Sequence, residues 1–180
     1  ADGPLKPQFC IERLYEHTKG DAIVVAGVGQ HQMWASQFWK FNEPRTWVNS
    51  GGLGTMGFAV PAALGAKAGR PDRRVIAIDG DGCSQMTSQE LATSTAEGIP
   101  FVTAIINNAH LGMVRQWQQF FHGNRYSESY MNALPDFVKL AEGYGHSGIR
   151  VESPSDVERA LREAFARKDE LVFMDFMTDQ

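Results

Sequence analysis

Residues 75–82, Val-Ile-Ala-Ile-Asp-Gly-Asp-Gly, join a continuous apolar run to an acidic, glycine-rich turn. A short apolar run that is rich in β-branched side chains and bounded by a turn predicts a strand buried on both faces. Residues 22–28 and 101–107 have the same character, and helical patterns lie between the three runs. Because buried strands that alternate with helices form parallel sheets, we expect an α/β fold. It should have three layers, helix–sheet–helix, around a mostly parallel sheet of about six strands.

The other predicted elements continue this alternation. Further strands are expected around Val48, at residues 149–151 and at residues 171–177. Helices are predicted at residues 8–17, 31–38, 58–68, 88–97, 111–121, 137–144 and 155–168, with Ser155 as the cap of the last. Residues 2–7 contain two prolines and are typical of a linker. Because position 1 is not Met, we expect residues 1–180 to be one domain of a longer protein, with residues 1–7 as its linker.

Composition narrows the class of protein. Hydrophobic residues make up 43% of the chain and charged residues 21%, as in a globular domain. The 17 basic residues are outnumbered by 21 acidic ones and form no basic block, which argues against binding to nucleic acid or to an anionic membrane. Residues 46–66 are uncharged but contain Pro61 and several glycines, so a membrane helix is not expected. Two cysteines, Cys10 and Cys83, suggest neither a disulfide framework nor a zinc cluster and suit the reducing cytoplasm.

Polar residues follow two of the predicted strands. Asp81 comes just after the strand at residues 75–79, and Asn108 follows the strand at residues 101–107. The carboxyl ends of neighbouring parallel strands meet at one edge of a sheet, so these two side chains should lie close together. Oxygen donors of this kind suit Mg²⁺, which keeps positions open for water and phosphate. A diphosphate held through Mg²⁺ is the expected ligand, although an acidic residue between glycines is also a common turn.

A nucleotide-binding domain is the alternative at this point. The chain contains no G-x-x-x-x-G-K-[ST] motif, and the glycine-rich residues 51–57 do not follow a buried strand as G-x-G-x-x-G would. Both observations disfavour this alternative.

Several motifs together resemble a known family. Gly80-Asp81-Gly82 and Asn107-Asn108 resemble the magnesium–diphosphate motif of thiamine-diphosphate enzymes. Three further stretches are similar to the C-terminal, diphosphate-binding domain of acetolactate synthase large subunits: residues 27–34 (Gly-Val-Gly-Gln-His-Gln-Met-Trp), 50–57 (Ser-Gly-Gly-Leu-Gly-Thr-Met-Gly) and 112–118 (Gly-Met-Val-Arg-Gln-Trp-Gln). The resemblance extends from about Phe9 to Phe176 and implies the thiamine-diphosphate-binding fold.

The resemblance implies a role for each matching residue. The side chains of Asp81 and Asn108 and the main-chain carbonyl of His110 would bind Mg²⁺. Thiamine diphosphate would lie against these three residues and also against Val28, Gln30, His31, Gly54, Met56, Gly82, Cys83, Leu111 and Gly112. Met113 and Trp117 would line the substrate channel, where Trp117 matches the tryptophan that favours 2-ketobutyrate as acceptor.

Several of these residues have a simpler interpretation from the sequence alone. His31 would suit a helix cap or the core, Met56 the core, and Cys83 a small buried side chain. A stripe at helical spacing, typical of a packed helix face, is formed by Met113, Trp117, Phe120 and Phe121. The histidines without ligand spacing, which are predicted to lie on the surface, are His17, His122 and His146.

For the full-length protein the resemblance implies a thiamine-diphosphate-dependent acetolactate synthase, a transferase of branched-chain amino-acid biosynthesis. Such an enzyme decarboxylates pyruvate and joins the two-carbon unit to pyruvate or 2-ketobutyrate. Its activating glutamate lies on a pyrimidine-binding domain of a second subunit, and no residue here matches it. We therefore assign no catalytic residue and expect the chain alone to be inactive. FAD bound mostly outside this chain, a homodimer or larger assembly, a regulatory small subunit and a cytoplasmic location are also implied.

Two alternatives remain open. One is a related thiamine-diphosphate enzyme, such as a pyruvate oxidase or a benzoylformate-type decarboxylase, and the Gln-Trp-Gln stretch at residues 116–118 argues against it. The other is a non-catalytic binding domain, which would be consistent with the missing glutamate.

Overall fold

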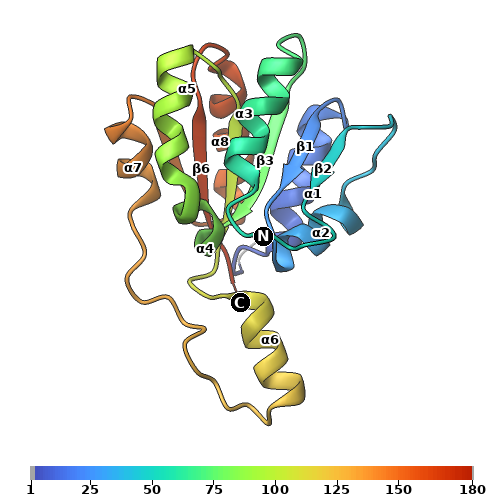
Figure 1. Ribbon diagram of the computed structural model, residues 1–180, viewed down its shortest axis with the longest axis vertical. Coiled ribbons are helices and arrows are strands. Elements are labelled where there is room, and N and C mark those ends of the chain that lie inside the picture. The colour runs from blue at the N-terminus through green and yellow to red at the C-terminus, as the bar shows by residue number, and fades with distance from the viewer. Residues whose placement is uncertain (1–2, 180) are drawn as a thin grey trace.

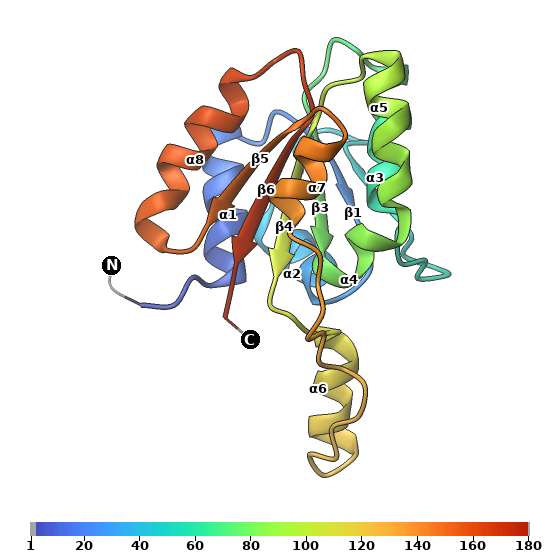
Figure 2. The same cartoon turned by 90° about the vertical axis from the view of Figure 1, so that its left-hand side faces the viewer.

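The computed structural model describes residues 3–179 and contains a central sheet between two layers of helices (Figure 1, Figure 2). The strands are β1 (Ile23–Ala26), β2 (Trp47–Asn49), β3 (Val75–Gly80), β4 (Val102–Asn107), β5 (Ser147–Val151) and β6 (Val172–Met177). They form a 6-stranded sheet in the order β2-β1-β3-β4-β6-β5, and every neighbouring pair is parallel. The predicted three-layer α/β fold is confirmed.

Helices cover both faces of the sheet. The helices of the two layers are α1 (Pro7–Thr18), α2 (Gln30–Phe38), α3 (Ala59–Gly69), α5 (Leu91–Glu97), α7 (Phe137–Gly143) and α8 (Pro154–Ala166). The first layer, α1, α2 and α8, packs on one face, and α3, α5 and α7 pack on the other (Figure 2). A short helix, α4 (Asp81–Ser84), and a 3₁₀-helix, η1 (Gln85–Glu90), lead into α5.

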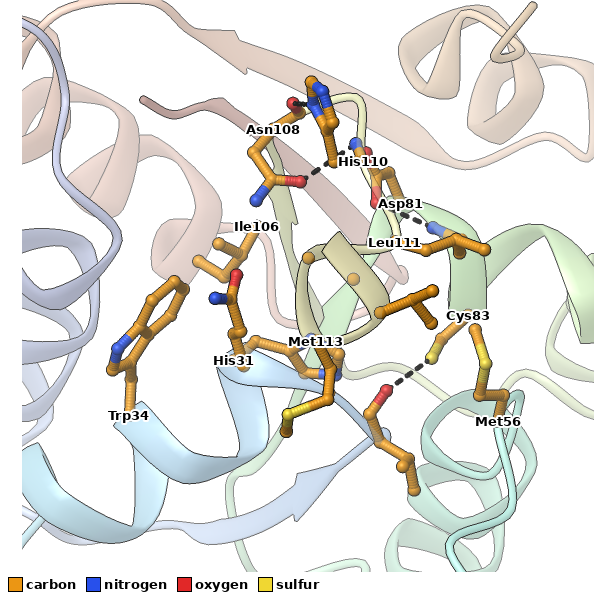
Figure 3. Close-up of a pocket in the computed structure, with 17 residues that line it drawn as sticks. His31, Trp34, Met56, Asp81, Cys83, Ile106, Asn108, His110, Leu111 and Met113 are labelled. Carbon is orange, nitrogen blue, oxygen red and sulfur yellow. Dashed lines mark hydrogen bonds between the residues drawn. The ribbon is translucent and has the colours of Figure 1, made fainter. Parts of the chain in front are cut away.

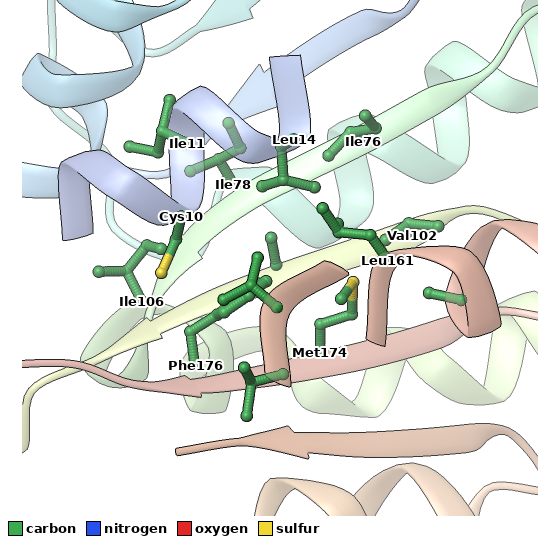
Figure 4. Packing of buried hydrophobic residues seen from close by; sticks show 14 of the residues in the cluster. Cys10, Ile11, Leu14, Ile76, Ile78, Val102, Ile106, Leu161, Met174 and Phe176 are labelled. Atoms are coloured by element: carbon green, nitrogen blue, oxygen red, sulfur yellow. The ribbon is translucent and has the colours of Figure 1, made fainter. Parts of the chain in front are cut away.

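The side chains of each strand alternate between two apolar cores. From β3, Ile76 and Ile78 enter the core under α1 and α8, whereas Val75 and Ala77 enter the core of α3, α5 and α7. Figure 4 shows the first core, in which side chains of α1 and α8 meet those of β3, β4 and β6. Because both faces of β3 are covered, its sequence stays apolar until Asp79.

The helices predicted at residues 88–97 and 155–168 differ most from the observed ones. The helix predicted at residues 88–97 is preceded by helical turns that begin at Asp81, directly after β3. The last helix begins at Pro154, so its cap is Ser153 and not Ser155. Proline is well suited to the first position of a helix, because its φ is already helical and its missing N–H would have no partner there.

Two buried residues were not expected. The prediction that His146 lies on the surface is wrong, since only 9% of this residue is exposed. Its Nε2 lies 3.0 Å from Thr95 Oγ1 and 3.2 Å from the Leu91 carbonyl oxygen, and a polar ring with such partners can be buried. Leu5, within the predicted linker, is also buried, and its carbonyl accepts a hydrogen bond from the Asp179 N–H at 2.8 Å.

One helix lies outside both layers. α6 (Gly112–Phe121) follows β4 and projects beyond the carboxyl ends of the strands (Figure 1, Figure 2). Residues after α6 return along it, and Gln118 Nε2 donates to the Ser127 carbonyl at 2.7 Å. No helix in the described part of the chain is both long enough and apolar enough to cross a membrane.

Candidate functional site

A hollow opens at the carboxyl ends of β1, β3 and β4 (Figure 3). The chain leaves β1 toward β2 and leaves β3 toward β4, in opposite directions along the sheet. Ligands of open parallel sheets bind where the strand order reverses in this way. The predicted site residues that line the hollow are Val28, Gln30, His31, Met56, Asp81, Gly82, Cys83, Asn108, His110, Leu111, Gly112 and Met113. The fold thus brings together residues that are far apart in the sequence.

Two predicted site residues lie outside this hollow. Gly54 is exposed in the loop before Met56, where its φ of 74° is readily adopted by glycine. Trp117 lies further along α6, and 58% of it is exposed. No residue of α6 is buried, so the interpretation of its apolar stripe as a packed helix face is wrong for the described part of the chain.

Asp81 is the buried carboxylate of the site. It begins α4 directly after β3, and its Oδ1 accepts a hydrogen bond from the Gly82 N–H at 2.8 Å. Its Oδ2 is also buried but has no hydrogen-bond partner among the described residues. Burial raises the pKa of Asp81 to about 6, although the N–H groups of Gly82 and Ala109 partly oppose this. A buried carboxylate oxygen that lacks a hydrogen-bond partner is available to bind a cation.

The loop after β4 faces Asp81. Asn108 Oδ1 accepts a hydrogen bond from the His110 N–H at 3.0 Å, and the His110 ring Nδ1 lies 2.8 Å from the Asn108 carbonyl oxygen. Ala109, between them, has a left-handed φ of 56°. Its N–H is close enough to Asp81 to lower the pKa of that carboxyl. The expectation that Asp81 and Asn108 occupy the same edge of the sheet is therefore confirmed.

Two glycines allow the loops to approach one another. A Cβ at Gly82 would lie 2.7 Å from Leu111 Cδ2, and a Cβ at Gly112 would lie 2.1 Å from Gln30 Oε1. Real Cβ atoms are essentially never this close to another atom, so a larger residue at either position would require the Leu111 or Gln30 side chain to move. Glycine at both positions leaves backbone groups accessible at the wall of the hollow.

Two buried polar side chains, His31 and Asp79, lie next to the hollow. His31 Nε2 is 3.6 Å from Asp79 Oδ1, and burial lowers the pKa of His31 to about 4. Asp79 Oδ2 accepts a hydrogen bond from Ser84 Oγ at 3.1 Å, and burial raises the pKa of Asp79 to about 7. The interpretation of His31 as a buried histidine is consistent with this position, which also borders the hollow.

Cys83 has the environment of an inert thiol. Its Sγ donates a hydrogen bond to the Val28 carbonyl at 3.1 Å, and burial raises the pKa of the thiol to about 12. A thiol of this kind stays protonated and is a poor nucleophile. The expectation of a small buried side chain at this position is confirmed.

Comparison with known protein families identifies the domain that carries this hollow. The family profile described as "Thiamine pyrophosphate enzyme, C-terminal TPP binding domain" matches residues 27–176. That range includes every residue that lines the hollow. The chain belongs to this family. It is therefore a thiamine pyrophosphate (thiamine diphosphate) binding domain.

Acetolactate synthases are similar to this thiamine pyrophosphate-binding domain over its whole length. The large subunit from Haemophilus influenzae is 52% identical over 180 residues, which are 100% of this chain and 31% of that protein. The Corynebacterium glutamicum large subunit is 56% identical over 180 residues, which cover 98% of this chain and 29% of that protein. The isozyme 3 large subunit of Escherichia coli is 50% identical over 177 residues, 97% of this chain and 31% of that protein. The chain thus spans less than a third of the length of these curated relatives.

Sequence reasoning missed part of the thiamine pyrophosphate-binding domain's polar framework. The sequence pattern indicates Asp79 only as the end of a strand and Asn107 only as the first half of an Asn-Asn pair, yet both are buried and hydrogen-bonded beside the hollow. A polar residue that ends an otherwise apolar strand was the available signal. The partner of Asn107, Asp175, could not be found from spacing, because it is on a different strand.

Proposed function

We propose that this chain is the diphosphate- and magnesium-binding domain of an acetolactate synthase, which decarboxylates pyruvate and condenses the two-carbon unit with pyruvate or 2-ketobutyrate. The observation that carries the metal-binding part of the proposal is the buried Oδ2 of Asp81, which has no partner among the described residues, and the similarity to acetolactate synthases over the whole chain supports the reaction. A buried carboxylate is unfavourable unless a cation or hydrogen bonds compensate its charge. On this proposal residues 1–180 form one domain of a longer enzyme, and residues 1–7 lead into it.

Mg²⁺ suits the chemistry of the residues at this position. Asp81 and Asn108 offer side-chain oxygens, and His110 offers its main-chain carbonyl. All three are hard oxygen donors, and so few protein ligands leave positions for water and diphosphate oxygens. Asn108 Oδ1 already accepts one hydrogen bond, from His110, but an amide oxygen has a second lone pair. A bound cation would lower the pKa of Asp81 and offset the cost of burying its charge.

The diphosphate would lie between the loops that follow β1, β3 and β4. Backbone groups of Gly82, Cys83, Leu111 and Gly112 would line one side, and Val28, Gln30 and His31 the other. Gly112 begins α6, so N–H groups of the first helical turn have no partner within the helix. Such N–H groups and the helix dipole both favour a phosphate group.

The remaining assignments concern the rings of the cofactor and the substrate. When bound, thiamine diphosphate would supply a nucleophilic carbon for the substrate carbonyl and a cationic ring that can take up the electron pair left by the departing CO₂. Gly54 and Met56 would contact the aminopyrimidine, and Met56 would hold the two rings in a bent arrangement. Met113 and Trp117 would form the apolar wall of the substrate channel, as their place at the hollow and along α6 allows.

The activating glutamate is proposed to come from the pyrimidine-binding domain of a second subunit. No glutamate lines the hollow in the described part of the chain. The large apolar side chains that α6 leaves exposed support a protein partner there: Val114, Trp117, Phe120 and Phe121. A homodimer or larger assembly, FAD held mostly by another part of the protein, a regulatory small subunit and a cytoplasmic location complete the proposal.

Titration of thiamine diphosphate into the chain, with and without Mg²⁺, tests the metal assignment when Asp81→Ala is compared with the unmodified chain. We expect Asp81→Ala to weaken the Mg²⁺-dependent affinity at least about a hundredfold, because loss of groups that only support a metal ligand already costs roughly 10–100-fold. Asp72→Ala is the matched control, since Asp72 is exposed and lies outside the hollow. Equal affinity in Asp81→Ala, or binding that does not depend on Mg²⁺, would remove the assignment.

A further inference from the structure

Asn107 connects the loop that carries the proposed metal ligands to a neighbouring strand. It is the last residue of β4 and is buried. Its Nδ2 donates a hydrogen bond to Asp175 Oδ1 on β6 at 2.9 Å. On its other side, Asn107 Oδ1 accepts a hydrogen bond from the Ala109 N–H at 3.2 Å. One amide side chain therefore bridges the sheet and the turn that contains Asn108 and His110.

Asp175 determines which way the Asn107 amide points. An ionised carboxylate can only accept hydrogen bonds, so the NH₂ group of Asn107 must face it and the amide oxygen must face Ala109. Arg150 on β5 stabilises the charge, with its Nε 3.5 Å from Asp175 Oδ2. The opposite amide orientation would place two acceptors together at Asp175 and two donors together at Ala109. Both contacts would be unfavourable.

Ala109 is held in a conformation that alanine does not prefer. Its φ of 56° lies in the left-handed region, which costs a residue with a Cβ roughly 1–2 kcal/mol. Two hydrogen bonds hold it there, one from its N–H to Asn107 and one to its carbonyl from the Met131 N–H at 2.9 Å. With Ala109 in this conformation, Asn108 and His110, on either side of it, both line the hollow.

We propose that Asn107 and Asp175 are positioning residues that hold Ala109 in its left-handed conformation and so present Asn108 and the His110 carbonyl to the metal. The inference rests on the proposed function, because it deepens the description of the same metal site. Neither residue contacts the cation. Each acts through the turn at residues 107–110.

The decisive experiment is a rescue. Asn107→Ala removes the bond to the Ala109 N–H, and we expect it to weaken Mg²⁺-dependent binding of thiamine diphosphate about 5- to 30-fold, the factor that corresponds to the cost of the left-handed conformation. Glycine adopts that conformation at no steric cost. In the Ala109→Gly background, Asn107→Ala should therefore cost much less affinity than it does in the unmodified chain. The double variant Asn107→Ala/Ala109→Gly should bind nearly as tightly as Ala109→Gly alone. An affinity loss that the glycine does not reverse would overturn the proposal.

A matched control separates positioning from a general loss of stability. Thr103 is buried on the same strand, β4, and its hydroxyl has no partner among the described residues. Thr103→Ala also changes a buried polar side chain of β4 but should leave the affinity unchanged, and Ala109→Gly should give no recovery in its background.

The role of Asp175 is tested by Asp175→Asn, which keeps the shape of the side chain but offers both donors and acceptors. This variant should weaken binding less than Asn107→Ala does, and Ala109→Gly should rescue it. Failure of that rescue would remove Asp175 from the proposal.

A second readout does not need the cofactor. The backbone conformation of Ala109 can be followed by NMR from its ¹³Cα and ¹³Cβ chemical shifts in alanine-labelled protein. We expect the left-handed signature in the unmodified chain and its loss in Asn107→Ala; persistence of the signature in that variant would contradict the inference.

Asp81→Ala distinguishes the two proposals, because unchanged cofactor affinity in that variant overturns the metal site. Weakened affinity in Asp81→Ala with normal affinity in Asn107→Ala overturns only the positioning role.

Discussion

The interior of the sheet and its carboxyl edge are built from the same strands but on opposite principles. Within β3, Ile76 and Ile78 are fully buried among apolar side chains of α1 and α8. A few residues later, Asp79 and Asp81 are equally enclosed but carry carboxyl groups, and Asp81 keeps one oxygen without a partner. Burial of apolar groups stabilises the fold, whereas burial of an unpaired acceptor opposes it. The buried, unpartnered oxygen of Asp81 thus lowers the stability of the fold at this edge, and a bound ligand can offset that loss.

Helices α8 and α6 show the same contrast in the helical layer. Both are strongly amphipathic in sequence. α8 buries its apolar stripe, which includes Val157 and Leu161, against the sheet, but α6 buries none of its residues. An amphipathic pattern therefore predicts that a helix has an apolar face without saying what covers that face. In the described part of the chain the apolar face of α6 stays exposed.

The largest expected effect lies in the interior. Leu161→Ala should lower the free energy of unfolding by about 2–5 kcal/mol, because it removes apolar contacts and leaves a cavity between α8 and the sheet. Equilibrium urea unfolding measures this difference. Arg162→Ala on the exposed side of the same helix is the control and should stay within about 0.5 kcal/mol. A loss below about 1 kcal/mol for Leu161→Ala would mean that the interior contributes less than its burial implies.

The second prediction tests how much the buried carboxylate of Asp81 lowers the free energy of unfolding. The folded pKa of Asp81 is about 6, above the unfolded value of about 3.9. Folding therefore takes up a proton between these two pKa values, and the contribution of Asp81 to stability falls as pH rises from about 4 to 6. Asp81→Asn cannot ionise, so in the absence of Mg²⁺ and cofactor it should be more stable than the unmodified chain at pH 8, by on the order of 2 kcal/mol.

Denaturant unfolding at pH 4 and pH 8 checks this sign. The difference between Asp81→Asn and the unmodified chain should nearly vanish at pH 4, where the folded carboxyl is protonated in the unmodified chain. Asp79, whose pKa burial raises to about 7, titrates in both proteins, and only a minor contribution to its pKa, the one from the charge of Asp81, differs between them. A variant that is less stable than the unmodified chain at pH 8 would contradict the claim that this carboxylate is uncompensated.

The smallest effect is expected on α6. Phe121 is 74% exposed, so Phe121→Ala should change the free energy of unfolding by no more than about 0.5 kcal/mol. This is the counterpart of Leu161→Ala, since both substitutions remove a large apolar side chain from an amphipathic helix. The same urea titration compares them. A loss of 2 kcal/mol or more for Phe121→Ala would show that α6 packs against the domain and would end the contrast with α8.

Much of the site could be predicted because its residues follow strands whose direction was known. Asp81 and Asn108 converge because parallel strands place their carboxyl ends at one edge, and this needs only the order of strands and helices. Trp117 shows the limit of the same reasoning. Its helical spacing was correct, but whether the stripe would be covered depended on elements that the pattern does not describe.

The amino-acid sequence by itself determined the alternation of buried strands and helices, and with it the parallel sheet and the edge at which polar residues gather. Periodicity is a local property, so it can be read directly from the chain. Only the tertiary structure decided which polar groups meet at that edge: Asn107 donates a hydrogen bond to Asp175 on another strand, and His31 of α2 lies 3.6 Å from Asp79 of β3. Such pairs depend on strand order and register, which arise when both cores pack together and which no short stretch of sequence encodes.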